Sequence, residues 1–183
     1  MSDATPAQSP IWMGILVAVA ILSSFALACG MPFAAIGALA ALTLGPRDAL
    51  VLAGIAWSTN QIIGFGFLGY PYDLLTFAWG AALGISALAA VVGAVLALRP
   101  FGSGSLALLP IAFIAAWASQ QGAVFLASLV LGASEIAFAP AVLWFIFWTN
   151  ALAFTALVLV QVIGARIGMA RPIAITSQRS VNA

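Results

Sequence analysis

Long runs of apolar residues, separated by short groups of glycine, proline and charged residues, make up most of this chain. A helix that crosses a bilayer needs about 20 apolar residues. The first run, residues 11–45, is too long for one such helix, and its only strong break is Cys-Gly-Met-Pro at 29–32. Glycine suits the end of a helix and proline the first turn of the next, so this break predicts a tight hairpin.

The same reasoning at the later breaks predicts an all-α fold, a polytopic membrane protein built as a six-transmembrane-helix bundle. The predicted helices cover residues 11–29, 32–45, 48–68, 74–98, 105–131 and 139–165, the second being short. Residues 1–10 and 166–183 are polar and are predicted to be tails around a membrane domain of 11–165. The N-terminal tail lacks the basic residues of a secretory signal, which predicts that the first helix is retained.

Composition leads to the same class of protein. Of the 183 residues, 65% are hydrophobic and 5% are charged, whereas soluble domains carry about 25% charged residues. So few charges cannot cover a soluble surface, so lipid must surround most of the chain. We therefore predict an integral protein of the bacterial inner membrane. The arginines are spread along the whole chain and form no basic patch, which argues against a nucleic-acid partner.

The charged residues divide between the two sides of the predicted bundle. One side receives the N-terminus and every arginine of the chain, namely Arg47, Arg99, Arg166, Arg171 and Arg179. The other side receives Asp73 and Glu135 and no arginine. Because arginines in membrane loops favour the cytoplasm, both termini are predicted to be cytoplasmic (N-in, C-in).

The residues on which most enzymes depend are scarce. The chain has no histidine, which excludes histidine-centred acid–base catalysis and histidine metal sites. No glycine-rich loop with a lysine is present to cradle a phosphate, so the chain cannot hydrolyse ATP by itself. The single cysteine, Cys29, cannot form an internal disulfide. We therefore predict a binding or scaffolding protein with no catalytic residue, cofactor or metal, rather than an enzyme.

Small residues recur four positions apart on three of the predicted helices, at 20–28, 34–38 and 82–94. Such spacing lets helix backbones approach closely in lipid. These faces either pack against one another inside the bundle or dock a partner membrane subunit.

Three predicted helices repeat a phrase in which carboxamide residues accompany tryptophan. This amide layer consists of Trp57, Asn60, Gln61, Trp117, Gln120, Gln121, Trp148 and Asn150. Counted from the predicted outer ends of their helices, Asn60, Gln120 and Asn150 all lie roughly 14–18 Å deep at about 1.5 Å per residue. A carboxamide that faced lipid would leave its hydrogen-bonding groups unpaired, at a cost of several kcal/mol. The three side chains therefore face one another or a cavity.

Two interpretations of the amide layer stay open. Interhelical amide bonds are common in membranes and are worth about 0.6–2 kcal/mol each, so the layer can serve to hold helices together. Alternatively, it forms a pocket in which aromatic walls and a few polar anchors bind a neutral or zwitterionic organic molecule. Gln161 lies near the cytoplasmic side and is predicted to pack or to lie at the interface. Glycines and aromatics over 64–73 predict either a lid over the cavity or a turn with an interfacial aromatic belt.

The stretch from Ala40 to Gly54, in which Leu-Gly-Pro-Arg-Asp precedes a run of small residues, resembles a turn found in substrate-binding subunits (S-components) of energy-coupling factor vitamin transporters. The six helices and the alanine-rich first helices are similar too, so the resemblance covers most of the chain. The family implies an outward-opening vitamin site, docking of a transmembrane coupling subunit, and energy from separate ATPases. Cobalamin-type relatives, some of which work alone, can use a cysteine thiolate as a cobalt ligand, a role that would fall to Cys29.

The sequence thus favours a membrane uptake subunit that binds a vitamin-like small molecule in an outward-facing intramembrane cavity and transports it inward. The residues of the amide layer are its predicted substrate-binding residues. The first alternative is an accessory or structural subunit of a membrane redox or photosynthetic complex, although the lack of histidine argues against a haem. The second is an exporter or a lipid-interacting scaffold.

Overall fold

A computed structural model of the chain describes residues 31–101, 105–132 and 138–170, together with the single positions 14, 18, 135 and 173. This part of the chain is helical and contains no strand. Its helices are α2 (Phe33–Thr43), α3 (Pro46–Gly66), α4 (Leu74–Leu98), α5 (Leu108–Leu131) and α7 (Pro140–Arg166). The all-α prediction is therefore confirmed.

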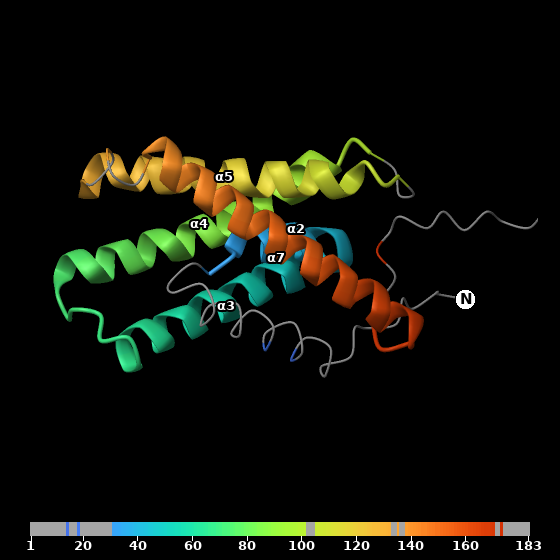
Figure 1. Ribbon diagram of the computed structural model, residues 1–183, viewed down its shortest axis with the longest axis horizontal. Helices are drawn as coiled ribbons and strands as arrows, with labels where there is room; N and C mark the ends of the chain where they lie inside the picture. The colour runs from blue at the N-terminus through green and yellow to red at the C-terminus, as the bar shows by residue number, and fades with distance from the viewer. Residues whose placement is uncertain are drawn as a thin grey trace, which may run out of the picture.

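Four of these helices, α3, α4, α5 and α7, are long and apolar enough to cross a membrane. They contain 21 to 27 residues, or about 32–40 Å at 1.5 Å per residue. Figure 1 shows them running lengthwise through the molecule, with α7 crossing obliquely in front. By length and composition, this is the construction of an integral membrane protein.

The ends of the long helices follow the breaks seen in the sequence. Proline occupies the first turn of α3 and of α7, where a missing N–H costs nothing. The side chain of Asp73 caps α4 by accepting a hydrogen bond from the Thr76 amide over 2.7 Å. That bond from the Thr76 backbone, with the Thr76 side chain in second place, holds the pKa of Asp73 below its ordinary value. At its C-terminus, α5 stops at Gly132, whose φ of 84° favours glycine.

The short helix α2 lies at the centre of the bundle and packs against α3, α4, α5 and α7. All but one of its residues are buried, which is unusual for a helix of a small protein because no face is left for solvent or lipid. Its small side chains permit this packing. A methyl group placed on Gly37 would come within 3.0 Å of Ala90 Cβ and 3.1 Å of the Val91 backbone nitrogen.

The second predicted spanning helix is therefore corrected. Eleven residues extend about 16 Å, which is half of a hydrocarbon core of about 30 Å. Residues 44 and 45 join α2 directly to the start of α3. The C-terminus of α2 therefore lies at one end of the bundle, and the N-terminus of α2 lies near mid-depth. The other predicted bounds agree with the structure to within three residues. The predicted first helix, 11–29, lies outside the described residues except for positions 14 and 18, which are helical.

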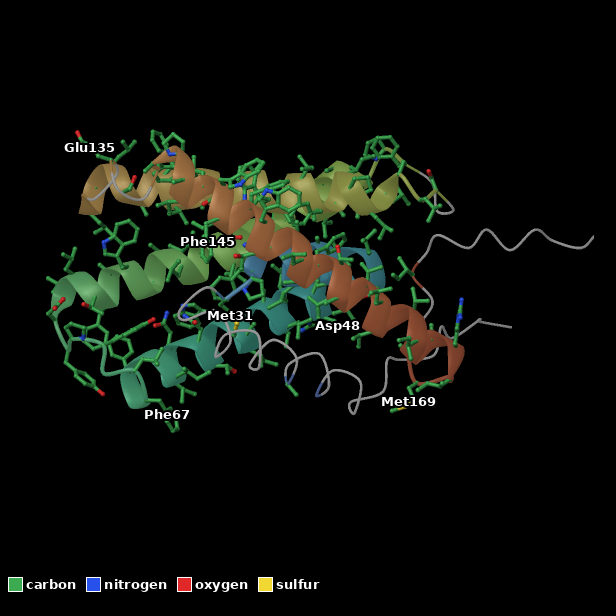
Figure 2. The ribbon with its side chains drawn as sticks, viewed as in Figure 1. Met31, Asp48, Phe67, Glu135, Phe145 and Met169 are labelled. Carbon is green, nitrogen blue, oxygen red and sulfur yellow. The ribbon has the colours of Figure 1, made fainter. Side chains whose placement is uncertain are left out.

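The charges separate as the sequence predicted, within the part of the chain that is described. Arg47, Arg99 and Arg166 lie at the end where α3 begins and α4 and α7 finish. Asp73 precedes α4 at the opposite end, and Glu135 lies between α5 and α7 at that same end (Figure 2). The remaining loop arginines, Arg171 and Arg179, lie outside the described residues.

The small-residue faces of α2 and α4 are internal. Ala34 and Ala38 on α2 are fully buried, as are Ser86, Ala90 and Ala94 on α4. Docking of a partner on these two faces is thus excluded by packing within the chain. The third face, at 20–28, lies outside the described residues.

Candidate functional site

A cavity of about 160 Å³ lies where the N-terminus of α2 meets the four long helices. Figure 2 shows Met31 and Phe145, which both line it, near the middle of the bundle. Its polar lining consists of Asn60, Gln120, Gln121, Thr149 and Asn150. Its apolar lining consists of Met31, Phe33, Leu83, Val124, Phe145 and Ile146. All five helices contribute, and no residue of this lining is charged.

The start of α2 forms one wall of the cavity. Pro32 is the N-cap residue and offers no side-chain cap to the first turn. Instead, Asn150 on α7 accepts a hydrogen bond from the Ala35 amide over 3.3 Å through Oδ1. The Nδ2 of Asn150 donates to the Ile146 carbonyl of its own helix over 3.0 Å. A neighbouring helix therefore supplies the cap that an N-cap side chain usually provides.

The other carboxamides of the cavity include buried polar atoms without a hydrogen-bond partner. Asn60 and Gln120 are each only 6% exposed. Gln120 Oε1 and Gln121 Nε2 have no hydrogen-bond partner, and Asn60 forms no hydrogen bond with any residue that the structure describes. Buried polar groups in native proteins are paired in roughly nine cases out of ten. Unpaired groups around a cavity that can hold water or a ligand therefore indicate partners from outside the chain.

Trp57 and Gln61 do not reach the cavity. Trp57 Nε1 donates to the Gly80 carbonyl over 2.8 Å, and Gln61 Nε2 donates to the same oxygen over 3.1 Å. A methyl group on Gly84 would come within 2.9 Å of the Trp57 ring, so glycines of α4 make room for both side chains. The polar atoms of these two residues join α3 to α4, and the predicted binding role of Trp57 and Gln61 stays a prediction.

The other two tryptophans also lie away from the cavity. Trp148 is 46% exposed and packs against Trp144 on the outside of the bundle, with ring centroids 5.5 Å apart. Trp117 packs edge-on against Phe147 at 5.4 Å, and its buried Nε1 has no partner. Neither residue lines the cavity. The aromatic side chains that line this cavity are Phe33 and Phe145.

The structure adds cavity residues that the amide layer did not contain. The most informative is the start of α2, whose signal in the sequence was the shortness of the helix after Pro32. Met31 and Phe33 reach the cavity only because α2 begins inside the bundle. Gln161 is fully buried, which agrees with its predicted packing role.

The aromatic segment after α3 forms a cluster of its own. Phe65 packs against Tyr70, Tyr72 and Phe77 with centroid distances of 4.9–5.8 Å. The Tyr72 hydroxyl donates to the Phe65 carbonyl over 3.0 Å, and the Tyr70 ring covers Gly64. None of these residues lines the cavity, so the segment is a folded turn with an aromatic cluster that does not border the cavity.

Metal binding finds no support in the described residues, which contain no group of three or more His, Cys, Asp or Glu side chains able to share an ion. Cys29, to which the family resemblance would give the role of a cobalt ligand, lies outside them. What the cavity offers chemically is a set of neutral hydrogen-bond donors and acceptors beside phenylalanine rings. Such a set of groups can hold a molecule by hydrogen bonds and ring contacts, and the lining contains no group that transfers a proton at neutral pH.

Comparison of the chain with protein-family models, with curated proteins and with solved structures gives no match. The class of protein is defined by the fold and the cavity alone: the described part of the chain is helical, and four of its helices are able to span a membrane around a buried half-length helix.

Proposed function

We propose that this protein is a membrane uptake subunit that binds a small neutral or zwitterionic organic molecule in the cavity at the start of α2. One observation supports the proposal above all others. Asn60, Gln120 and Gln121 all line a single cavity, and two buried polar atoms there, Gln120 Oε1 and Gln121 Nε2, have no hydrogen-bond partner, although buried polar atoms are usually paired. Carboxamides that only joined helices would be paired with those helices, as Gln61 is with Gly80.

The size of the cavity narrows the ligand. Drug-sized ligands occupy pockets of about 300–1,000 Å³, whereas an apolar protein cavity of about 150 Å³ accommodates benzene. The 160 Å³ present here suits a molecule built on one ring. A corrin such as cobalamin is far larger, so we propose a small vitamin-like or metabolite-like ligand.

Orientation follows from the arginines. In the proposed topology the end that holds Arg47, Arg99 and Arg166 faces the cytoplasm, with both termini on that side, in a bacterial inner membrane. The cavity then opens toward the outer half of the bilayer, and α2 fills the inner half beneath it. A ligand that enters from outside stops at α2. Inward transport requires a second state, and a coupling subunit with its ATPases would drive it from a face other than the buried ones of α2 and α4.

The experiment combines native mass spectrometry with binding measurements on the purified full chain in lipid nanodiscs. A co-purified small molecule is identified, and its affinity is measured for wild type, Asn60→Ala and Gln120→Ala. Loss of one ligand hydrogen bond is worth about 0.5–1.5 kcal/mol net and more where a ligand group is left unpaired. We therefore expect affinity to fall roughly 3- to 100-fold.

Gln61→Ala is the matched control, because Gln61 is a carboxamide of the same helix as Asn60 but bonds to Gly80 outside the cavity. The Gln61→Ala variant should bind the ligand with the same affinity as wild type. A protein that carries no small molecule, with stability lowered equally by Asn60→Ala and Gln61→Ala, would favour the accessory-subunit alternative and refute the uptake proposal.

A further inference from the structure

We infer that the ligand of this cavity is a zwitterion, with its carboxylate at the N-terminus of α2 and its ammonium group against the side-chain oxygens of Gln120 and Asn60. The inference rests on the proposed function and specifies its substrate class. It comes from the combination of a helix that begins inside the bundle with buried carboxamides that have no partner.

The N-terminus of α2 supplies the positive side of the site. A helix start carries the equivalent of about half a positive charge, because the first amides have no carbonyl partner within the helix. In α2 this end lies near mid-depth, and Phe33 and the capping residue Asn150 both line the cavity. Half-length helices in membrane proteins direct such ends at anionic groups of a substrate. An incoming carboxylate can take the place of Asn150 Oδ1 on the Ala35 amide, whose present bond is long at 3.3 Å.

Gln120 on α5 supplies the acceptor. Gln120 is only 6% exposed, and its Oε1 accepts no hydrogen bond. Asn60 adds a second carboxamide at the same burial, also without a hydrogen bond to a described residue. An unpaired carbonyl oxygen in such a place favours a ligand with an N–H group, and a charged donor gives the stronger bond.

Charge balance selects the zwitterion over a simple anion or cation. The lining contains no charged side chain, so a monoanion would have only the partial charge of α2 to offset its loss of hydration, and a monocation would have only the dipoles of the carboxamide oxygens. Burying an uncompensated charge is expensive. A zwitterion has no net charge, and each of its ends meets a group of suitable polarity.

The test uses purified full-length protein in nanodiscs and two matched sets of ring compounds. The first set is proline, cyclopentanecarboxylate, pyrrolidine and cyclopentanecarboxamide, which are zwitterion, anion, cation and neutral amide on a five-membered ring. The second is the corresponding set on a six-membered ring. Affinities are measured by isothermal titration, and any co-purified compound is assigned to one of the same charge classes. We expect zwitterions to bind roughly tenfold or more tightly than the neutral amides.

Two variants locate the ends of the ligand. Asn150→Asp keeps an acceptor for the Ala35 amide but places a full negative charge at the start of α2, so it should reverse the preference from zwitterion to cation. Gln120→Leu removes the acceptor without adding charge, so it should weaken zwitterions and cations while leaving anions unaffected. Gln61→Leu, outside the cavity, is the control and should alter none of these affinities.

The outcomes separate the inference from the proposed function. Neutral amides that bind wild type as tightly as zwitterions, or a co-purified neutral compound, would overturn the zwitterion and leave the uptake subunit standing. A protein without a co-purified molecule that also binds no member of either set would overturn the uptake proposal and the inference with it. Zwitterion preference that survives Asn150→Asp unchanged would show that the carboxylate does not lie at α2.

Discussion

Asn150 and Asn60 line the same cavity, yet they should respond oppositely to truncation in the ligand-free protein. In Asn150→Ala the Ala35 amide loses its only cap and the Ile146 carbonyl loses a donor. The first bond is weak at 3.3 Å, but an unpaired buried amide costs about 1–3 kcal/mol. Interhelical bonds in membranes average about 0.6 kcal/mol and reach about 1.7. We therefore expect Asn150→Ala to lower the free energy of unfolding by about 1–2 kcal/mol.

Asn60→Ala removes a carboxamide that has no partner among the described residues. No hydrogen bond is lost, and a buried polar group without a partner disappears, so the apo protein should be unchanged or slightly more stable. The assay is reversible unfolding in mixed lipid–detergent micelles, followed by tryptophan fluorescence, without ligand. Equal losses of stability at positions 60 and 150 would refute this reasoning, because they would show that both amides join helices.

Three further predictions address the packing, the helix cap and the topology. Gly37→Ala should lower the free energy of unfolding by about 1–3 kcal/mol relative to Gly122→Ala in the same assay, because only the first methyl group meets a neighbouring backbone. Asp73→Asn should keep the cap of α4 but remove an acid-dependent part of stability. That part is present in wild type above the unfolded pKa of Asp73 and is lost as pH falls through its lowered folded pKa, which melting curves from pH 2 to 6 will reveal. In a cysteine-free background, an impermeant thiol reagent should label Glu135→Cys in intact cells and spare Ser105→Cys; the reverse pattern would invert the topology.

The bounds of the long helices could be predicted because they depend on local chemistry. Proline in the first turns of α3 and α7, and an aspartate before α4, determine helix starts regardless of tertiary contacts. The convergence of Asn60, Gln120 and Asn150 could be predicted for a similar reason, since helix rise determines depth along a bundle.

The side to which each residue of the amide layer turns could not be predicted so well. Trp57, Asn60 and Gln61 share one helical face by their spacing. In the structure, however, Trp57 and Gln61 contact α4 and Asn60 lines the cavity. This division depends on the glycines of α4, a different helix. Trp148 and Asn150 are two residues apart and must point in different directions on a helix, so the exposure of Trp148 was available from spacing alone. The half-length of α2 was visible in the sequence, but its central place depends on every neighbour.

The small residues of α2 have a mechanical consequence. Six of its eleven residues are alanine or glycine, and where these residues form the contact surface few side chains protrude to interlock with a neighbour, so lengthwise displacement meets lower barriers there than it would between leucine-rich surfaces. Sliding of packed helices by such small steps is shear motion. The bond between Asn150 and Ala35 is the described polar contact that would resist such a slide at the cavity. A ligand carboxylate that displaced Asn150 would break this hydrogen bond. Ligand binding in the cavity and the movement of α2 would then be coupled through the Ala35 amide.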